Sequence, residues 1–521
     1  MSSFGKKLDD YYRRLGERGL LLALFTAALC LHVVFSLRMN LPSLLHDEFG
    51  TAAWSAYFSG YNYSGEGSQG WLTGVLYTPF YYFFDNPVIR YRSMLIFNGV
   101  FASLIPLFTY KITASLGVQK AWQKTLCAIV AGVGTTVFAY TKFIRTETLS
   151  VFFPFLIFLL LVESAGVKNW LLRFLLSVFI AFILAFAPAA DTRLWLLVLA
   201  FIITALYSRF VLRLKNISFL GFLPAFAVFA TLQVYVSERL FAAATDSAPF
   251  TREIWNFGRD AEDSVPYIGD FIAGLYHLAV STWGVGILGI CLCFFLFAAE
   301  KPKNRDGELL RTFAFFALFY NTFMLLLPAG SGLFINSASP LLIIFALCFF
   351  FMHGLDFNRL LTSAAALGII FALPFTPATL EEVSAVFCLF ALLFVLVCCA
   401  ERYRTHMISL SIFLVALFSG FNTAFVFLPH EANSAELENA AANVISGQVY
   451  NSADAPPTYI LGNPELAPIL RFLNRNTTIN TADSPDELPE DCFVIKRDEA
   501  GELIFTAKGE RAEAYALSQE T

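Results

Sequence analysis

The sequence of 521 residues is 57% hydrophobic and only 14% charged, whereas a soluble protein carries roughly a quarter charged residues. Apolar runs of about twenty residues recur along most of the chain, and each is long enough to cross a ~30 Å hydrocarbon core. Because these runs are continuous and do not alternate with polar residues, they exclude a β-barrel and indicate an all-α polytopic membrane protein.

Hydropathy predicts about thirteen membrane spans within a transmembrane module of residues 1–428. The predicted spans are 20–37, 93–112, 122–140, 147–164, 170–188, 194–212, 217–236, 272–298, 310–328, 337–353, 360–376, 383–399 and 407–428. The first run is too long for a cleavable signal and lacks a small-residue cleavage site, so we interpret it as the first span.

The distribution of charge between the connections predicts the orientation. With the N-terminus placed in the cytoplasm, the inner connections and adjoining span ends hold 20 of the 35 Lys and Arg residues but only 9 of the 40 Asp and Glu residues. Basic residues are enriched in cytoplasmic loops. We therefore expect a multi-pass protein of the cell membrane, with a cytoplasmic N-terminus and an extracytoplasmic C-terminus.

The first outer loop, residues 38–92, begins with "LLHDEFG", which places Asp47 and Glu48 side by side just after the first span. Further along, "GTAAWSAYFSG" and "VLYTPFYYFF" are typical of short amphipathic helices on the membrane surface, with Trp and Tyr as interfacial anchors. The acidic pair has two interpretations. It is either a solvated pair that caps the following helix, or a catalytic group at the membrane rim.

Two other short connections place ionisable residues at the same rim. Lys142, Arg145 and Glu147 come from "YTKFIRTETLS", and Asp191 and Arg193 come from "APAADTRLW". The alternative is a passive one, in which the acid belongs to an ordinary first helical turn and the cations reach toward lipid headgroups. If helices of one bundle bring these residues together, carboxylates stand beside cations at a lipid surface.

That combination suits sugar transfer from a lipid-linked phosphate. A carboxylate can accept the proton of an attacking hydroxyl as general base, and arginine can hold the departing phosphate with paired N–H donors. Such a donor carries no nucleotide, so no nucleotide-binding fold is needed. The chain contains neither a P-loop nor a dinucleotide-binding fingerprint.

The C-terminal tail, residues 429–521, alternates strand-like and helix-like stretches. "TYIL", "TTINTA", "CFVIKR" and "LIFTAK" are typical of strands, and "PELAPILRFLNR" is typical of a helix. This order predicts a small α/β domain outside the membrane.

The stretch "LLHDEFGTAAWSAYFSGYNYSG", with the aromatic-rich "GWLTGVLYTPFYYFFDNPVIRYRSMLIFN" after it, resembles the first outer loop of GT-C glycosyltransferases. That superfamily includes protein O-mannosyltransferases and the aminoarabinose transferases of lipid A. The resemblance is clearest over residues 20–215 and rests on architecture beyond them. It implies an inverting transferase that moves a sugar from a polyprenyl-phosphate donor to an envelope glycan, lipid or protein, with no nucleic-acid partner.

The resemblance assigns the catalytic base to Asp47, with Glu48 as its motif partner and Glu147 as a second acidic residue. The candidates for binding the donor phosphate are Arg193, Arg145 and Lys142. The candidates for binding other parts of the substrate are His46, Asp191 and Arg92, although an interfacial anchor is the alternative for Arg92 and its neighbour Arg90. Asp47 and Glu48 could hold a divalent cation, since hard cations choose oxygen ligands, but no "D-x-D" motif or histidine cluster supports a metal.

Three other functions remain open at this stage. A secondary transporter or flippase would place ionisable groups near the bilayer midplane, where the predicted spans have few. A polymerase or ligase of lipid-linked glycans would share the polyprenyl carrier but use a different loop signature. A non-catalytic envelope scaffold would tolerate replacement of Asp47.

Overall fold

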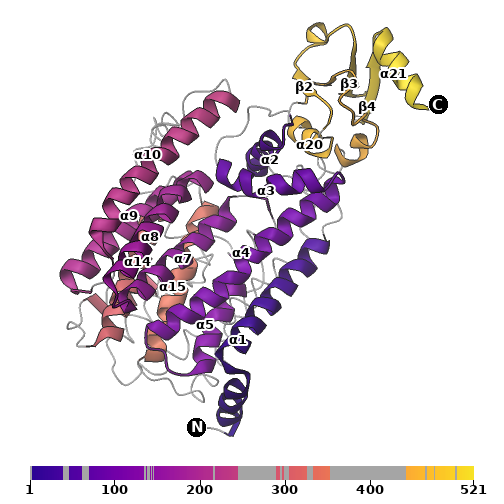
Figure 1. Cartoon of the computed structure of the whole chain (residues 1–521). Coiled ribbons are helices and arrows are strands. Elements are labelled where there is room, and N and C mark those ends of the chain that lie inside the picture. Colours follow the sequence, from indigo (N-terminus) through magenta and orange to yellow (C-terminus); the bar gives the residue numbers. More distant parts are fainter. Residues whose placement is uncertain are drawn as a thin grey trace, which may run out of the picture.

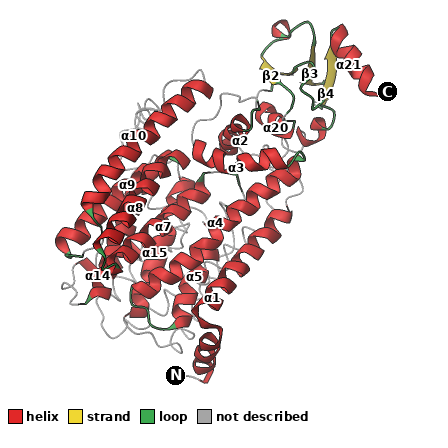
Figure 2. Cartoon of the chain, viewed as in Figure 1, coloured by secondary structure: helices red, strands yellow, loops and turns green. Residues whose placement is uncertain are grey.

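The computed structural model is a bundle of long helices that carries a small α/β unit at one end (Figure 1). Among the described residues, helices make up the bundle, and the strands lie in the C-terminal unit (Figure 2). The structure describes residues 3–38, 46–61, 70–133, 146–214, 217–244, 304–325, 332–352, 442–463, 466–474, 476–498 and 502–520, together with isolated positions between 137 and 144 and between 278 and 297.

The described bundle centres on α4 (Pro87–Ser115), which contacts the helices α1, α5 and α7. On the other side of the bundle, α8 packs against α7, α9 and α10, and α14 packs against α9 and α15. The bounds of these helices are α1 Ser3–Arg38, α5 Ala121–Val133, α7 Glu147–Gly166, α8 Trp170–Ala190, α9 Trp195–Leu206, α10 Phe219–Ala244, α14 Arg305–Leu325 and α15 Gly332–Met352.

Six segments of the described chain are long and apolar enough to cross a membrane: Leu15–Leu37, Pro87–Ser115, Glu147–Gly166, Trp170–Ala190, Thr192–Val211 and Phe219–Ala243. They confirm six of the predicted spans. The predicted spans 310–328 and 337–353 fall on α14 and α15, and 122–140 begins with α5. Nearly all of 272–298, and all of 360–376, 383–399 and 407–428, lie outside the described residues.

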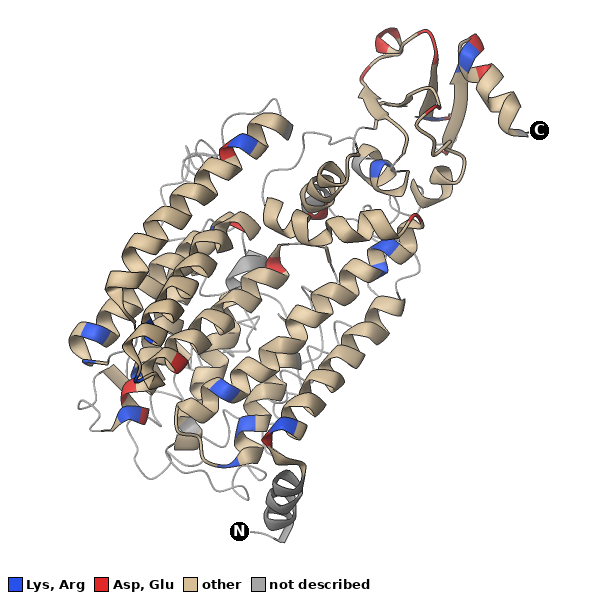
Figure 3. Ribbon diagram, viewed as in Figure 1, with Lys and Arg blue, Asp and Glu red and all other residues tan. Residues whose placement is uncertain are grey.

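Charge is segregated along the bundle (Figure 3). Lys and Arg gather at the end that carries the N-terminus, where Lys111 Nζ lies 2.6 Å from Glu17 Oε1. The opposite end carries the first outer loop and the C-terminal unit (Figure 1). This segregation agrees with the positive-inside rule, and the assignment of that end to the cytoplasm stays a prediction.

The C-terminal unit is a four-stranded sheet of order β2-β1-β3-β4. β1 (Thr458–Leu461) is parallel to both β2 (Ile479–Ala482) and β3 (Cys492–Arg497), while β4 (Leu503–Lys508) is antiparallel to β3. Helix α20 (Leu466–Leu473) connects β1 to β2, and α21 (Glu510–Glu520) follows β4. All four expected strands and the expected helix are present, whereas the sequence reading did not anticipate α21.

The first outer loop contains two helices, α2 (His46–Phe58) and α3 (Trp71–Phe83), at the positions of the two predicted surface helices. Their expected role as surface anchors is wrong for three of the large aromatic residues, whereas Tyr82 and Phe83 at the end of α3 are exposed. Trp54, Tyr77 and Tyr81 are buried. The reason is tertiary packing: α2 contacts α3 and α20, and α3 contacts α4 and α8, so the aromatic faces meet protein.

The start of α4 is fixed by a local signal. The side chain of Asn86 accepts hydrogen bonds from the backbone N–H groups of Val88 (2.9 Å) and Ile89 (3.1 Å), and Pro87 occupies the first helical position. α4 therefore begins within the predicted first outer loop, and Arg90 and Tyr91 lie near its start.

Candidate active site

Glu48 lies in the first turn of α2, and its carboxylate is buried. Its Oε1 accepts a hydrogen bond of 2.7 Å from the backbone N–H of Ile144 and one of 3.3 Å from the hydroxyl of Tyr91. Glu48 therefore ties the first outer loop to α4 and to the connection that leads into α7.

A second polar link joins α3 to the same connection. The hydroxyl of Tyr77 donates to Oδ1 of Asn98, and Nδ2 of Asn98 donates to the carbonyl of Phe143 at 2.8 Å. Burial raises the pKa of Tyr77, the hydrogen bond to Asn98 lowers it, and the charges of Glu48 and Glu147 raise it again, with a net increase. Tyr77 thus stays protonated, and both carboxylates act electrostatically on its hydroxyl.

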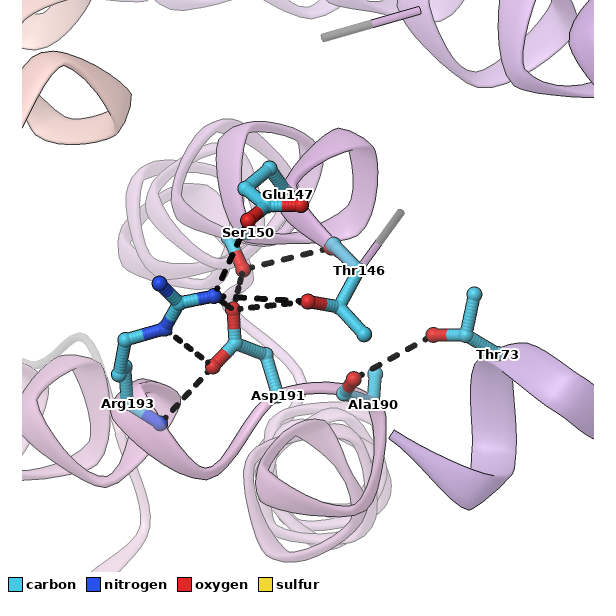
Figure 4. Close-up of polar contacts among 7 residues, drawn as sticks. All are labelled: Thr73, Thr146, Glu147, Ser150, Ala190, Asp191 and Arg193. Carbon is cyan, nitrogen blue, oxygen red and sulfur yellow. Dashed lines mark hydrogen bonds and ion pairs between the residues drawn. The ribbon is translucent and has the colours of Figure 1, made fainter. Parts of the chain in front are cut away.

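A buried charged cluster lies where α7 begins and α8 ends (Figure 4). Arg193 contacts Asp191 in a two-point arrangement, with Nε 2.8 Å from Oδ1 and Nη2 2.7 Å from Oδ2. Nη2 also lies 3.4 Å from Oε1 of Glu147. Glu147 and Arg193 come from different connections, so their contact confirms the expectation that rim residues of the two connections come together.

Asp191 organises the cluster. It follows the last residue of α8, and its Oδ1 accepts a 3.0 Å hydrogen bond from the backbone N–H of Arg193, capping the short 3-10 helix η1 (Thr192–Leu194). Ser150 donates to its Oδ2 at 2.6 Å, and Thr146 does so at 3.3 Å. Burial raises the pKa of Asp191, but the charge of Arg193 and the hydrogen bonds from Arg193 and Ser150 outweigh burial and hold it below its usual value.

The start of α3 packs beside this cluster, against the last residue of α8. The hydroxyl of Thr73 donates to the carbonyl of Ala190 at 3.3 Å (Figure 4). Gly70 has a φ of 84°, and a Cβ there would lie 2.4 Å from Cγ2 of Thr146 and 2.7 Å from the Ala190 carbonyl oxygen. Only glycine fits both the left-handed backbone and the close approach.

Glu48 and the Arg193 cluster are neighbours through the chain segment that connects them. Glu48 binds the backbone of Ile144, and Thr146 contacts Asp191 and Arg193. Two residues of chain span at most about 7 Å, so the two contact points cannot be far apart. The structure thus brings Glu48, Glu147, Asp191 and Arg193 to one end of the bundle.

Five other predicted site residues come from α2, from α4 and from the connection before α7. His46 and Asp47 belong to α2, but their side chains lie outside the described part of the structure, as do Lys142 and Arg145 altogether. Arg92 lies on α4, one residue beyond Tyr91, and is partly exposed. The catalytic role of Asp47 and the phosphate-binding roles remain predictions.

The arrangement of helices and sheet is similar to that of a solved structure. No family model and no curated protein matches the sequence. Among solved structures, ArnT from Cupriavidus metallidurans, bound to undecaprenyl phosphate or in the apo state, superposes with a TM-score of 0.55 at 13% identity, over 92% of this chain and 93% of that chain. The chain has a GT-C fold.

A second similarity is weaker. The apo oligosaccharyltransferase from Archaeoglobus fulgidus superposes with a TM-score of 0.43 at 10% identity, over 92% of this chain and 65% of that chain. We draw nothing from this one. The GT-C fold shown by ArnT confirms the resemblance noted in the first outer loop at the level of architecture, namely a polytopic helical bundle with a small C-terminal sheet.

The sequence reading missed several residues that shape this end of the GT-C bundle. Tyr91 donates a hydrogen bond to Glu48, and Ser150 donates one to Asp191. Tyr77 and Asn98 link α3 to the connection before α7. An asparagine within an apolar span is a usable signal, because a polar group there needs a partner. Arg90, read as an anchor to the membrane interface, is instead buried.

The described part of the chain contains no group of three or more His, Cys, Asp or Glu side chains arranged to hold a metal ion. The Asp47 side chain lies outside that part, so this finding does not test a cation bound between Asp47 and Glu48.

Proposed function

We propose that this protein is an inverting glycosyltransferase that moves a sugar from a polyprenyl-phosphate donor to a glycan, lipid or protein of the cell envelope. The observation that carries the proposal is the buried Glu147–Asp191–Arg193 cluster, whose neighbours Ile144 and Ala190 bind Glu48 of α2 and Thr73 of α3. ArnT, which shares the fold, was solved bound to undecaprenyl phosphate, and this supports a polyprenyl phosphate as the carrier.

In the proposed reaction, Asp47 acts as the general base. An acceptor hydroxyl attacks the anomeric carbon from the face opposite the phosphate, and Asp47 takes its proton. The new C–O bond forms as the bond from the anomeric carbon to the phosphate oxygen breaks, so the configuration inverts and the electron pair leaves with the polyprenyl phosphate. Glu48 already accepts hydrogen bonds from Ile144 and Tyr91, which fix the position of α2. This structural role of Glu48 supports its neighbour Asp47 as the proton acceptor.

The departing phosphate is stabilised by Arg193, with Lys142 and Arg145 as further cations from the neighbouring connection. Asp191 holds the Arg193 guanidinium through two nitrogen atoms, so less side-chain freedom is lost when a phosphate binds. Of the two ion pairs of Arg193, the one with Glu147 is the longer, at 3.4 Å. A phosphate would compete most readily with that contact.

The test uses purified full-length protein, radiolabelled polyprenyl-phosphate sugars and a panel of envelope acceptors. We compare wild type with Asp47→Asn and Arg193→Lys. Lys111→Ala is the matched control, because it removes a charge from the partly exposed ion pair with Glu17 at the opposite end of the bundle. Loss of a general base lowers turnover roughly 10²–10⁴-fold, whereas the control should retain full turnover. Equal turnover of Asp47→Asn and wild type would reject the proposed base.

A further inference from the structure

The C-terminal unit is joined to the first outer loop by a buried cation. Arg90, near the start of α4, is buried, and its guanidinium carbon lies 4.6 Å from the ring centre of Tyr81 and 4.7 Å from that of Phe472. Its Nη2 also donates to the carbonyl of Phe472. Cation–π contacts are strongest where the cation is removed from water, so this junction is a specific one.

Phe472 comes from α20, the crossover helix of the C-terminal sheet. Its ring packs at nearly right angles against the rings of Tyr81 and Tyr91, with centre-to-centre distances of 6.0 and 6.1 Å. Apolar residues of α20 and the sheet share one buried cluster with residues of α2, α3 and α4. The unit therefore docks on the loop as part of a common core, and Figure 1 shows α20 beside α2.

Both tyrosines that touch Phe472 also bind α2. Tyr91 donates to the carboxylate of Glu48 at 3.3 Å, and Tyr81 donates to the carbonyl of Ala52 at 3.2 Å. Glu48 and Ala52 are one helical turn apart, so the two hydroxyls hold successive turns of the same helix. A rotation of either ring would move a hydrogen-bond donor away from α2.

We infer that Phe472 and Arg90 are positioning residues for sugar transfer, through which the C-terminal unit sets the orientation of Glu48 and of the helix that carries Asp47. This inference rests on the proposed function for its catalytic consequence. The contacts themselves predict that the planar ring, and not only its apolar volume, is required: a cation lies over the face of the ring, and two tyrosine rings meet it at nearly right angles, 90° and 87°.

The experiment compares Phe472→Leu with Phe472→Tyr in the full-length protein. Leucine supplies apolar volume without a ring, whereas tyrosine keeps the ring. Tyr515→Ala is the control, since Tyr515 packs against Tyr450 and Phe493 within the C-terminal unit. Two measurements are made on each variant: steady-state sugar transfer, resolved into kcat and KM, and hydrogen exchange of the α2 backbone.

For Phe472→Leu we expect kcat to fall at least ten-fold with KM changed less than three-fold, and exchange in α2 to accelerate at least ten-fold. Phe472→Tyr should restore both to within three-fold of wild type, and Tyr515→Ala should change neither. Leucine and tyrosine variants that behave alike would overturn the inference. If wild type transfers no sugar from any donor, the proposed function fails, whereas the exchange comparison still decides whether Phe472 holds α2.

Discussion

Replacing Asp191 by asparagine should cost several kcal/mol of stability, because it removes the charge that Arg193 faces while keeping the size of the side chain. Asp191 is 1% exposed and Arg193 12% exposed, so solvent screens the pair little. Removing one partner of a buried ion pair typically costs about 3–5 kcal/mol. Glu147 stays 3.4 Å from Arg193 and compensates in part, so we expect the lower end, about 3 kcal/mol.

A double-mutant cycle isolates the interaction. The stabilities of wild type, Asp191→Asn, Arg193→Gln and the double variant are measured by reversible unfolding in mixed detergent micelles. We expect a coupling energy of about 2 kcal/mol, within the range for residues in direct contact. Ser150→Ala provides the scale, since loss of its hydrogen bond should cost about 1–1.5 kcal/mol. A coupling energy below about 0.5 kcal/mol would refute the argument that this pair orders the rim.

The pH dependence of the same pair supplies an independent check. The pKa of Asp191 in the folded protein lies below its usual value, so the unfolded chain binds the proton more readily. The stabilisation is therefore complete above the unfolded pKa of about 3.9 and is lost as the pH falls through the folded pKa. Wild type should approach the stability of Asp191→Asn only in that acidic range. A stability difference that stays constant through that acidic range, to a pH below the folded pKa, would contradict the assignment.

Two further substitutions test the hydrogen bond between Tyr91 and Glu48 and the close approach of Gly70 to Thr146 and Ala190. Tyr91→Phe deletes the hydroxyl that donates to Glu48. Its loss should lower the free energy of unfolding by about 1 kcal/mol and turnover in the transfer assay roughly five-fold. Unchanged turnover would argue against a role for that hydrogen bond. Gly70→Ala introduces a Cβ within 2.4 Å of Thr146 and 2.7 Å of Ala190 on a left-handed backbone, and should lower stability by about 2 kcal/mol or more in the same unfolding assay; a neutral effect would contradict the close approach.

The sequence carries the architecture because its determinants are local. Length and apolarity define spans such as 147–164 and 170–188, and short strands flanked by turn residues define the C-terminal sheet. The meeting of Glu147 with Arg193 was also predictable, since each lies in a short connection at the same end of neighbouring helices. Such positions follow from topology alone.

The contacts that build the site depend instead on residues far apart in sequence. Arg90 and Phe472 are 382 positions apart, and nothing near Arg90 distinguishes a buried cation from one that reaches toward lipid headgroups. The same holds for Trp54 and Tyr81, whose aromatic pattern fits a membrane surface as well as a protein interior. Tertiary packing decides between burial and exposure, and the local sequence pattern does not indicate which distant residue will contact each side chain.

The separation between Arg90 and Phe472 has a consequence for biogenesis. A ribosome adding roughly 5–20 residues per second needs roughly 20–80 s to travel the 382 residues between them. During that interval the nascent helix bears a cation and tyrosine rings whose cover has not yet been made. Chains that end before Phe472 would keep Arg90 and the two tyrosine rings without this cover.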